Sequence, residues 1–128
     1  MKEKTGNGIA RHIKSPQTDY DLHSLIEKRW SPRSFSEKEI SEEQLFELFD
    51  AARWAASAFN EQPWQYVYAF RGTPGFEQLW NCLMPGNQPW TKSAAVLMVT
   101  MYRKSRKKTG TPNSSAAHDL GMANAHLL

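Results

Sequence analysis

Two short stretches carry more polar groups than a simple connection needs. In the first, KRWSPRSF (residues 28–35), Arg29, Ser31 and Arg33 occupy alternate positions where a predicted helix breaks. Alternate side chains of an extended backbone share a face, and two guanidinium groups with a hydroxyl on one face suit an anionic oxygen cluster such as a phosphate. An arginine near a helix C-terminus is also favoured by the helix dipole. On spacing alone, that structural interpretation is the stronger one.

The second stretch, SAFNEQPW (residues 57–64), lies between two apolar segments. Asn60 and Gln62 each carry donor and acceptor groups, the combination that the edge of a heterocycle with carbonyl and ring N–H groups requires. A loop that leaves a helix and enters a buried strand lies at the rim of a sheet, where α/β folds commonly bind ligands. A polar loop whose amides cap nearby backbone explains the same residues equally well.

Two predicted helices precede the second stretch. An apolar periodicity from Leu22 predicts a helix that is capped by one of the aspartates before it and stops at Ser31, because the proline that follows disfavours a helical residue at that position. Ser41 and Gln44 form a capping-box signature for a second helix, roughly residues 42–56. The polar stretch therefore connects this helix to whatever follows it.

Two strands and a third helix are predicted next. WQYVYAF (residues 64–70) is rich in strand formers, and Phe76 begins an amphipathic helical pattern that the PGNQP segment ends. AAVLMVTMY (residues 94–102) is apolar on both alternating faces, as expected of a strand covered by helices on both sides. The order of helices and strands predicts a three-layer α/β arrangement.

The last segment, residues 114–128, predicts a helix capped by Ser114 or Ser115. Ala117, Gly121 and Ala125 recur every four residues, which would leave a smooth strip for close approach of another helix. Two predicted strands are few for a sheet covered on both faces. We therefore expect a longer protein, and the alternative is a small domain completed by self-association.

Length and composition limit the class of protein. The 128 residues, 40% of them hydrophobic, fit one globular domain. No stretch approaches the roughly 18 consecutive apolar residues of a membrane span, and the basic opening segment lacks the apolar middle of a secretory signal. We expect a cytoplasmic protein with a flexible tail over residues 1–19 and a domain over residues 20–128.

The composition also argues against a metal site. Cys82 is the only cysteine, and the four histidines are scattered without the spacing of a helical zinc site. We predict no metal, and we interpret Cys82, inside the amphipathic helix beside Leu83, as a core residue.

The positive charge is concentrated in RKSRKK (residues 103–108), which contains five cations; the rest of the chain has 11 basic and 13 acidic side chains. Such a run can bind a phosphate backbone. A polyanion- or nucleic-acid-binding module is therefore one alternative function, although a solvated loop is the favoured interpretation and no nucleic acid partner is expected.

Together, LIEKRWSPRSF, AARWAASAFNEQPWQYVYA and GNQPWTKSAAVLMVT resemble, in this order, the nitroreductase family of FMN-dependent oxidoreductases. Members of that family have an Arg-x-Ser-x-Arg or Lys element, followed later by Pro-Ser-x-x-Asn-x-Gln-Pro-Trp. The resemblance covers residues 22–128. Ala56 replaces the proline of the second element, and Trp30 stands where many members have a second arginine or a histidine.

The resemblance implies roles for eight residues. The first element would hold the phosphate and ribityl chain of FMN, and the second would contact the flavin, in part from the partner subunit. A further asparagine in PGNQPW matches a position that touches the flavin ring in several members. The expected cofactor-binding residues are Arg29, Trp30, Ser31, Arg33, Ser57, Asn60, Gln62 and Asn87.

The resemblance also implies an α+β fold, a three-layer α/β/α sandwich, whose two subunits interlock as a homodimer with FMN at the interface. Electrons would pass from NAD(P)H through FMN to a small acceptor such as a nitroaromatic or a quinone, and no side chain is expected to act as catalytic acid or base. The second half of the family domain would be absent, so that the chain ends after the central dimer helix. A catalytically silent fragment is the other alternative.

Overall fold

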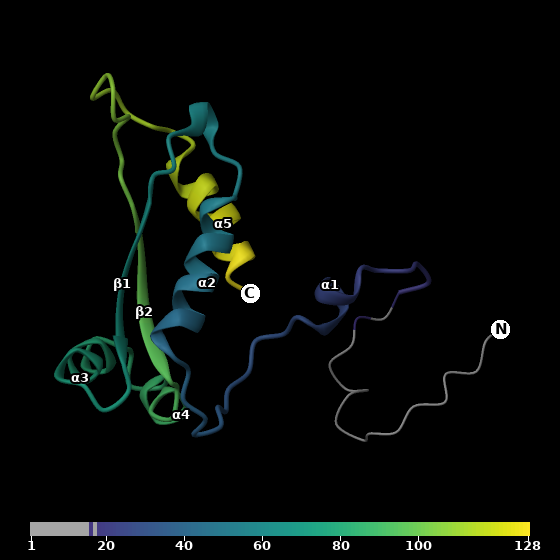
Figure 1. Ribbon diagram of the computed structural model, residues 1–128, viewed down its shortest axis with the longest axis vertical. Coiled ribbons are helices and arrows are strands. Elements are labelled where there is room, and N and C mark those ends of the chain that lie inside the picture. The colour runs from purple at the N-terminus through teal and green to yellow at the C-terminus, as the bar shows by residue number, and fades with distance from the viewer. Residues whose placement is uncertain (1–15, 17) are drawn as a thin grey trace. The chain divides into compact units, whose positions relative to one another are not determined.

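The computed structural model describes residue 16 and residues 18–128 (Figure 1). Two compact units, Met1–Pro32 and Arg33–Leu128, divide the chain. Most of the tail expected over residues 1–19 lies outside the described residues, and the domain boundary at residue 20 stays a prediction.

The described part of the first unit contains one helix, α1 (Ser24–Lys28). His23 caps it, because its Nδ1 accepts a hydrogen bond of 3.3 Å from the Leu25 N–H, so the predicted aspartate cap is wrong. The helix ends three residues before Ser31, and Arg29 is already extended. A five-residue helix that buries none of its side chains has little to offset the cost of helix nucleation.

The second unit is built on an antiparallel pair of strands, β1 (Trp64–Phe70) and β2 (Val96–Tyr102). Trp64 pairs with Tyr102 at one end and Phe70 pairs with Val96 at the other. The predicted first strand is confirmed, and the second begins two residues later than expected.

Two helices cover one face of this pair, α2 (Glu42–Arg53) and α5 (Ala116–His126) (Figure 1). The capping box at the start of α2 is confirmed, since Ser41 and Gln44 exchange both hydrogen bonds. Aromatic contacts join α2 to β1, and small residues let α5 pack closely on α2. Ala52, Ala55 and Ala123 form the core of this layer.

The helix α3 (Pro74–Asn81) packs against the other face of the strands at one end. Its Phe76 is fully buried, and a Cβ on Gly75 would lie 3.2 Å from the Cβ of Ala69, so the helix backbone lies close to the sheet. The three-layer α+β arrangement is confirmed. A short helix that the sequence did not predict, α4 (Gln88–Thr91), precedes β2.

The prediction that β2 is covered on both faces is wrong for this chain. Val67, Val99 and Met101 share the face opposite α2 and α5, and all three are exposed. The helix α3 reaches only the end of this face near Ala69.

The strip of small residues on α5 also faces outward. Ala117, Gly121 and Ala125 are exposed, whereas the core side of the helix buries Ala116 and Ala123. Apart from the backbone of its own helix and its chain neighbours, no atom of the described residues lies within 4 Å of the Cβ that Gly121 would carry. The strip is therefore open to another chain, and its role in a dimer stays a prediction.

Candidate functional site

The loop before β1, residues 57–63, is called the amide loop here. Phe59, Asn60 and Gln62 have φ values of 56°, 54° and 43°, in the left-handed region. For a phenylalanine or a glutamine this conformation costs roughly 1–2 kcal/mol, whereas asparagine adopts it more readily. Strain of this kind persists only where the surroundings enforce it, and it concentrates at functional sites.

Several hydrogen bonds hold the amide loop. The Ser57 Oγ accepts from the Gln62 N–H at 3.1 Å, and the Gln62 Nε2 donates to the Arg53 carbonyl at 3.3 Å. The Asp119 Oδ2 of α5 accepts from the Ala58 N–H at 3.1 Å. Ser57 and Gln62 therefore support nearby backbone, as the structural interpretation of this stretch predicted.

Two side chains of the amide loop remain exposed. Phe59 is 80% exposed, and the Asn60 side chain makes no hydrogen bond within the described part of the chain. The loop thus presents an aromatic ring and an unused amide to the outside. An amide in this position can both donate to and accept from a ligand.

The role of Asp119 was not predicted from the sequence. Its carboxylate is only 3% exposed and reaches across from another helix to the amide loop. An aspartate in the first turn of a helix is ordinary, because the helix dipole favours it there. The sequence therefore has no signal that separates Asp119 from a surface aspartate.

Glu61 links the amide loop to the basic run, residues 103–108. Its Oε2 accepts from the Lys107 N–H at 2.9 Å and from the Arg103 Nη2 at 3.0 Å. The Lys107 N–H bond, followed by the Arg103 guanidinium, lowers the pKa of Glu61 against the opposing effect of its burial. Sequence reasoning missed this contact, because the two partners are far apart along the chain.

The first arginine element is divided between the two units. Arg29 Nη1 donates to Ser31 Oγ at 3.2 Å, which confirms that these alternate side chains share a face. Trp30 belongs to the same unit and is 43% exposed. Arg33 begins the second unit and is exposed.

The segment that follows Arg33 contacts the start of α4. Phe35 stacks on Trp90 with 5.9 Å between ring centroids, and the Ser93 Oγ donates to the Phe35 carbonyl at 3.2 Å. Trp90 Nε1 in turn donates to Asn87 Oδ1 at 3.2 Å. Within the second unit, the structure therefore brings the Arg33 segment and Asn87 to one place.

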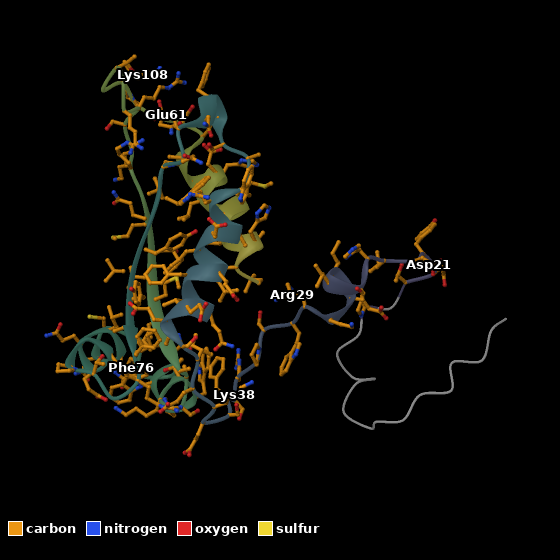
Figure 2. All side chains as sticks on the ribbon, viewed as in Figure 1. Asp21, Arg29, Lys38, Glu61, Phe76 and Lys108 are labelled. Atoms are coloured by element: carbon orange, nitrogen blue, oxygen red, sulfur yellow. The ribbon has the colours of Figure 1, made fainter. Side chains whose placement is uncertain are left out.

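This place and the amide loop lie at opposite ends of the strands. The amide loop precedes Trp64, whereas α4 precedes the end of β2 that pairs with Phe70. Seven paired residues separate these ends by roughly 20 Å. Figure 2 shows Glu61 near one end and Phe76 near the other. Within the second unit, the predicted site residues thus form two clusters rather than one site.

Other sequence expectations concern cysteine, metal and membrane. Cys82 is exposed, so its interpretation as a core residue is wrong; it follows the last turn of α3, beyond the buried Phe76. Among the described residues, no group of three or more His, Cys, Asp and Glu side chains could hold a metal ion. None of the helices in the described part of the chain is long and apolar enough to cross a membrane.

Comparisons with known proteins agree with these features. A model of the nitroreductase family matches residues 26–81, which include both polar stretches. A protein of Streptomyces coelicolor, provisionally named NADH dehydrogenase/NAD(P)H nitroreductase, is 36% identical over 66 residues, 52% of this chain and 32% of the relative. The chain spans about a third of the length of the curated relatives it matches.

Solved structures share the fold. An oxidoreductase containing FMN has a TM-score of 0.81 and 36% identity, over 87% of this chain and 58% of that one. A provisionally assigned nitroreductase of Desulfovibrio desulfuricans, in complex with FMN, has a TM-score of 0.66 and 20% identity, over 80% and 56% of the two chains. The second similarity concerns the fold alone. In the matched sequence, the shared fold and the order of its two polar elements, this chain is similar to the nitroreductase family.

Proposed function

We propose that this chain is the flavin-holding part of an FMN-dependent oxidoreductase, which passes electrons from NAD(P)H to a small acceptor such as a nitroaromatic or a quinone. One observation carries the proposal: the amide loop is held in a strained conformation that exposes the unused amide of Asn60. Such strain needs a reason, and presenting a side chain to a ligand is one.

The available donors fit FMN. The Arg29 guanidinium and Ser31 hydroxyl lie side by side and suit a phosphate, whose oxygens accept charge-assisted hydrogen bonds. The Asn60 amide offers both a donor and an acceptor to the pyrimidine edge of a flavin. Trp30 and Arg33 flank the phosphate group in this proposal, and Asn87 contacts the ring.

The division of labour follows from these contacts. FMN, when bound, would supply the hydride and electron chemistry. The chain binds its phosphate through Arg29 and Ser31 and orients its ring through Asn60. Donors near the pyrimidine edge stabilise the negative charge that reduction adds there. Ser57 and Gln62 act mainly by holding the loop that carries Asn60.

A homodimer with FMN at its interface is part of the proposal. In one chain the amide loop and the cluster around Asn87 lie at opposite ends of the strands, so a single flavin ring could meet both only if two chains contribute. The exposed small strip on α5 supports a close helix contact between chains.

The electron donor and the location are also proposals. The names of the curated relatives mention NADH and NAD(P)H, which supports a reduced nicotinamide as the donor. The single cysteine is compatible with the reducing environment of the cytoplasm, where we place the protein.

The substitution Arg29→Ala tests the phosphate contact. Removing one charge-assisted contact costs about 1.5–3 kcal/mol, so we expect FMN affinity to fall by roughly ten- to a hundredfold. Flavin fluorescence titration of the native protein measures this, and urea unfolding should show an unchanged midpoint. Lys28→Ala, which removes a neighbouring exposed cation, is the matched control.

Two results would contradict the proposal. Unchanged flavin retention in Arg29→Ala would show that the phosphate lies elsewhere. A native protein that is purified without flavin and cannot be reconstituted with FMN would favour the catalytically silent alternative.

A further inference from the structure

A hollow of about 360 Å³ lies between the amide loop and the basic run. Phe59, Asn60 and Glu61 line one side of it, and residues 106–109 line the other. Its volume is within the usual range for small-molecule sites. Because Asn60 belongs to its wall, a ligand in the hollow would lie beside the proposed flavin contact.

The two arginines of the basic run behave differently. Arg103 is committed to the protein, since its Nε donates to the Ser105 carbonyl at 2.8 Å and its Nη2 binds Glu61. The Arg106 guanidinium makes no hydrogen bond within the described residues, and its Nε is buried without a partner. The guanidinium lies over the Phe59 ring, 4.4 Å from the centroid, and its charge helps to lower the pKa of Glu61. Arg103 therefore holds the loop in place, whereas the N–H groups of Arg106 can still donate to a ligand.

The charge of the hollow is strongly positive. Arg106, Lys107 and Lys108 line it together with one carboxylate, that of Glu61, which Arg103 already neutralises. Figure 2 shows Lys108 at the tip of its loop and Glu61 below it. A buried, unpartnered guanidinium nitrogen is costly unless a ligand or water pairs with it. The donor set matches phosphate oxygens, which accept from arginine in a planar, two-point geometry.

We propose that this hollow binds the phosphate groups of the reduced nicotinamide dinucleotide, so that the basic run selects the electron donor. This inference rests on the proposed function for the identity of the donor. A dinucleotide whose nicotinamide lies over the flavin beside Asn60 would extend its phosphates toward Arg106, Lys107 and Lys108. The exposed Phe59 ring offers a surface on which the adenine or ribose can pack.

Arg106→Ala tests the inference in the native, FMN-loaded protein. Anaerobic stopped-flow reduction measures the apparent Kd of NADH and NADPH from the concentration dependence of flavin bleaching. We expect this Kd to rise by roughly ten- to a hundredfold, with an unchanged rate at saturation. Lys108→Ala, at an exposed position, should raise it by a smaller factor without any effect on folding.

Two controls isolate the phosphate contact. Lys38→Ala removes an exposed cation at the other end of the strands and should leave the Kd unchanged (Figure 2). N-benzyl-1,4-dihydronicotinamide donates hydride but has no phosphate, so Arg106→Ala should reduce flavin with it as the unsubstituted protein does. If Arg106→Ala slows this donor equally, or leaves the Kd of both dinucleotides unchanged, the inference is wrong.

A flavin-independent measurement separates this inference from the proposed function. Calorimetric titration of the native protein with ADP should detect binding that weakens in Arg106→Ala and at high salt. Arg106-dependent ADP binding in a protein that takes up no FMN would support the phosphate site and contradict the oxidoreductase proposal. Absence of ADP binding, or tighter binding of a single-stranded oligonucleotide than of ADP, would overturn the inference.

Discussion

The two ends of the β1–β2 pair are held together in different ways. At the amide-loop end, three non-glycine residues have left-handed backbones, and two carboxylates, those of Asp119 and Glu61, each accept a backbone N–H. At the other end, Asn87 is held by a hydrogen bond to the indole of Trp90, and Phe35 stacks on the same indole. The first end depends on carboxylates that accept backbone N–H groups, and the second on aromatic stacking and an uncharged side-chain hydrogen bond.

Among the non-glycine residues that the structure describes, the strained backbone lies at the amide-loop end. A loop that served only to connect α2 to β1 would not need left-handed backbone at a phenylalanine, because glycine could adopt it without cost. Contacts from α5 and from the basic run enforce the conformation instead. The structure therefore resembles a site that is formed before its ligand arrives, which lowers the ordering cost of binding.

Asp119→Ala should give the largest loss of stability. It leaves the Ala58 N–H without its partner and empties a buried position, so we expect the free energy of unfolding to fall by about 2 kcal/mol. Asn87→Ala, at the other end, removes only an exposed hydrogen bond and should change stability by about 0.5 kcal/mol or less. Urea unfolding of the native protein measures both values. Equal losses for the two variants would remove the distinction between the ends.

The difference in stability between a glycine and an alanine variant tests whether the amide loop is strained. At Phe59, where φ is 56°, Phe59→Gly should be more stable than Phe59→Ala by about 1 kcal/mol, because only glycine adopts this backbone freely. Glu47 is exposed in the middle of α2, and there Glu47→Ala should be more stable than Glu47→Gly by a similar amount. Thermal unfolding of the four variants gives the comparison. If the alanine variant were more stable than the glycine variant at both positions, the amide loop would be unstrained.

Local sequence signals predicted the regular elements well. The capping box fixed the start of α2, and the run of strand formers fixed both ends of β1, because these signals act between residues that are close in the chain. The same signals missed α4, since its proline was interpreted as ending a helix, although proline is tolerated in a first helical turn.

Long-range contacts explain what the sequence could not predict. The residue types of the candidate site were visible, but the roles of Asp119 and Glu61 depend on partners brought near only by folding. The basic run was interpreted as a solvated loop because composition cannot distinguish Arg103, paired with Glu61, from Arg106, whose guanidinium has no hydrogen bond among the described residues. The outward position of the α5 strip likewise depends on which side of the helix meets α2.

Acid titration should reveal the smallest of these effects, the contact between Glu61 and the basic run. Because its N–H partner and Arg103 lower the pKa of Glu61, folding stabilises the ionised carboxylate. This contribution is present above the ordinary pKa of about 4.5 and is lost as the pH falls through the lower value of the folded state.

Urea unfolding between pH 7 and pH 3 should therefore show that Glu61→Gln loses less stability on acidification than the unsubstituted protein does. The stability curves of the two proteins should converge at low pH. Glu47→Gln corrects for the loss of one surface carboxylate. Parallel curves for Glu61→Gln and the unsubstituted protein would mean that the amide loop and the basic run are not coupled through this carboxylate.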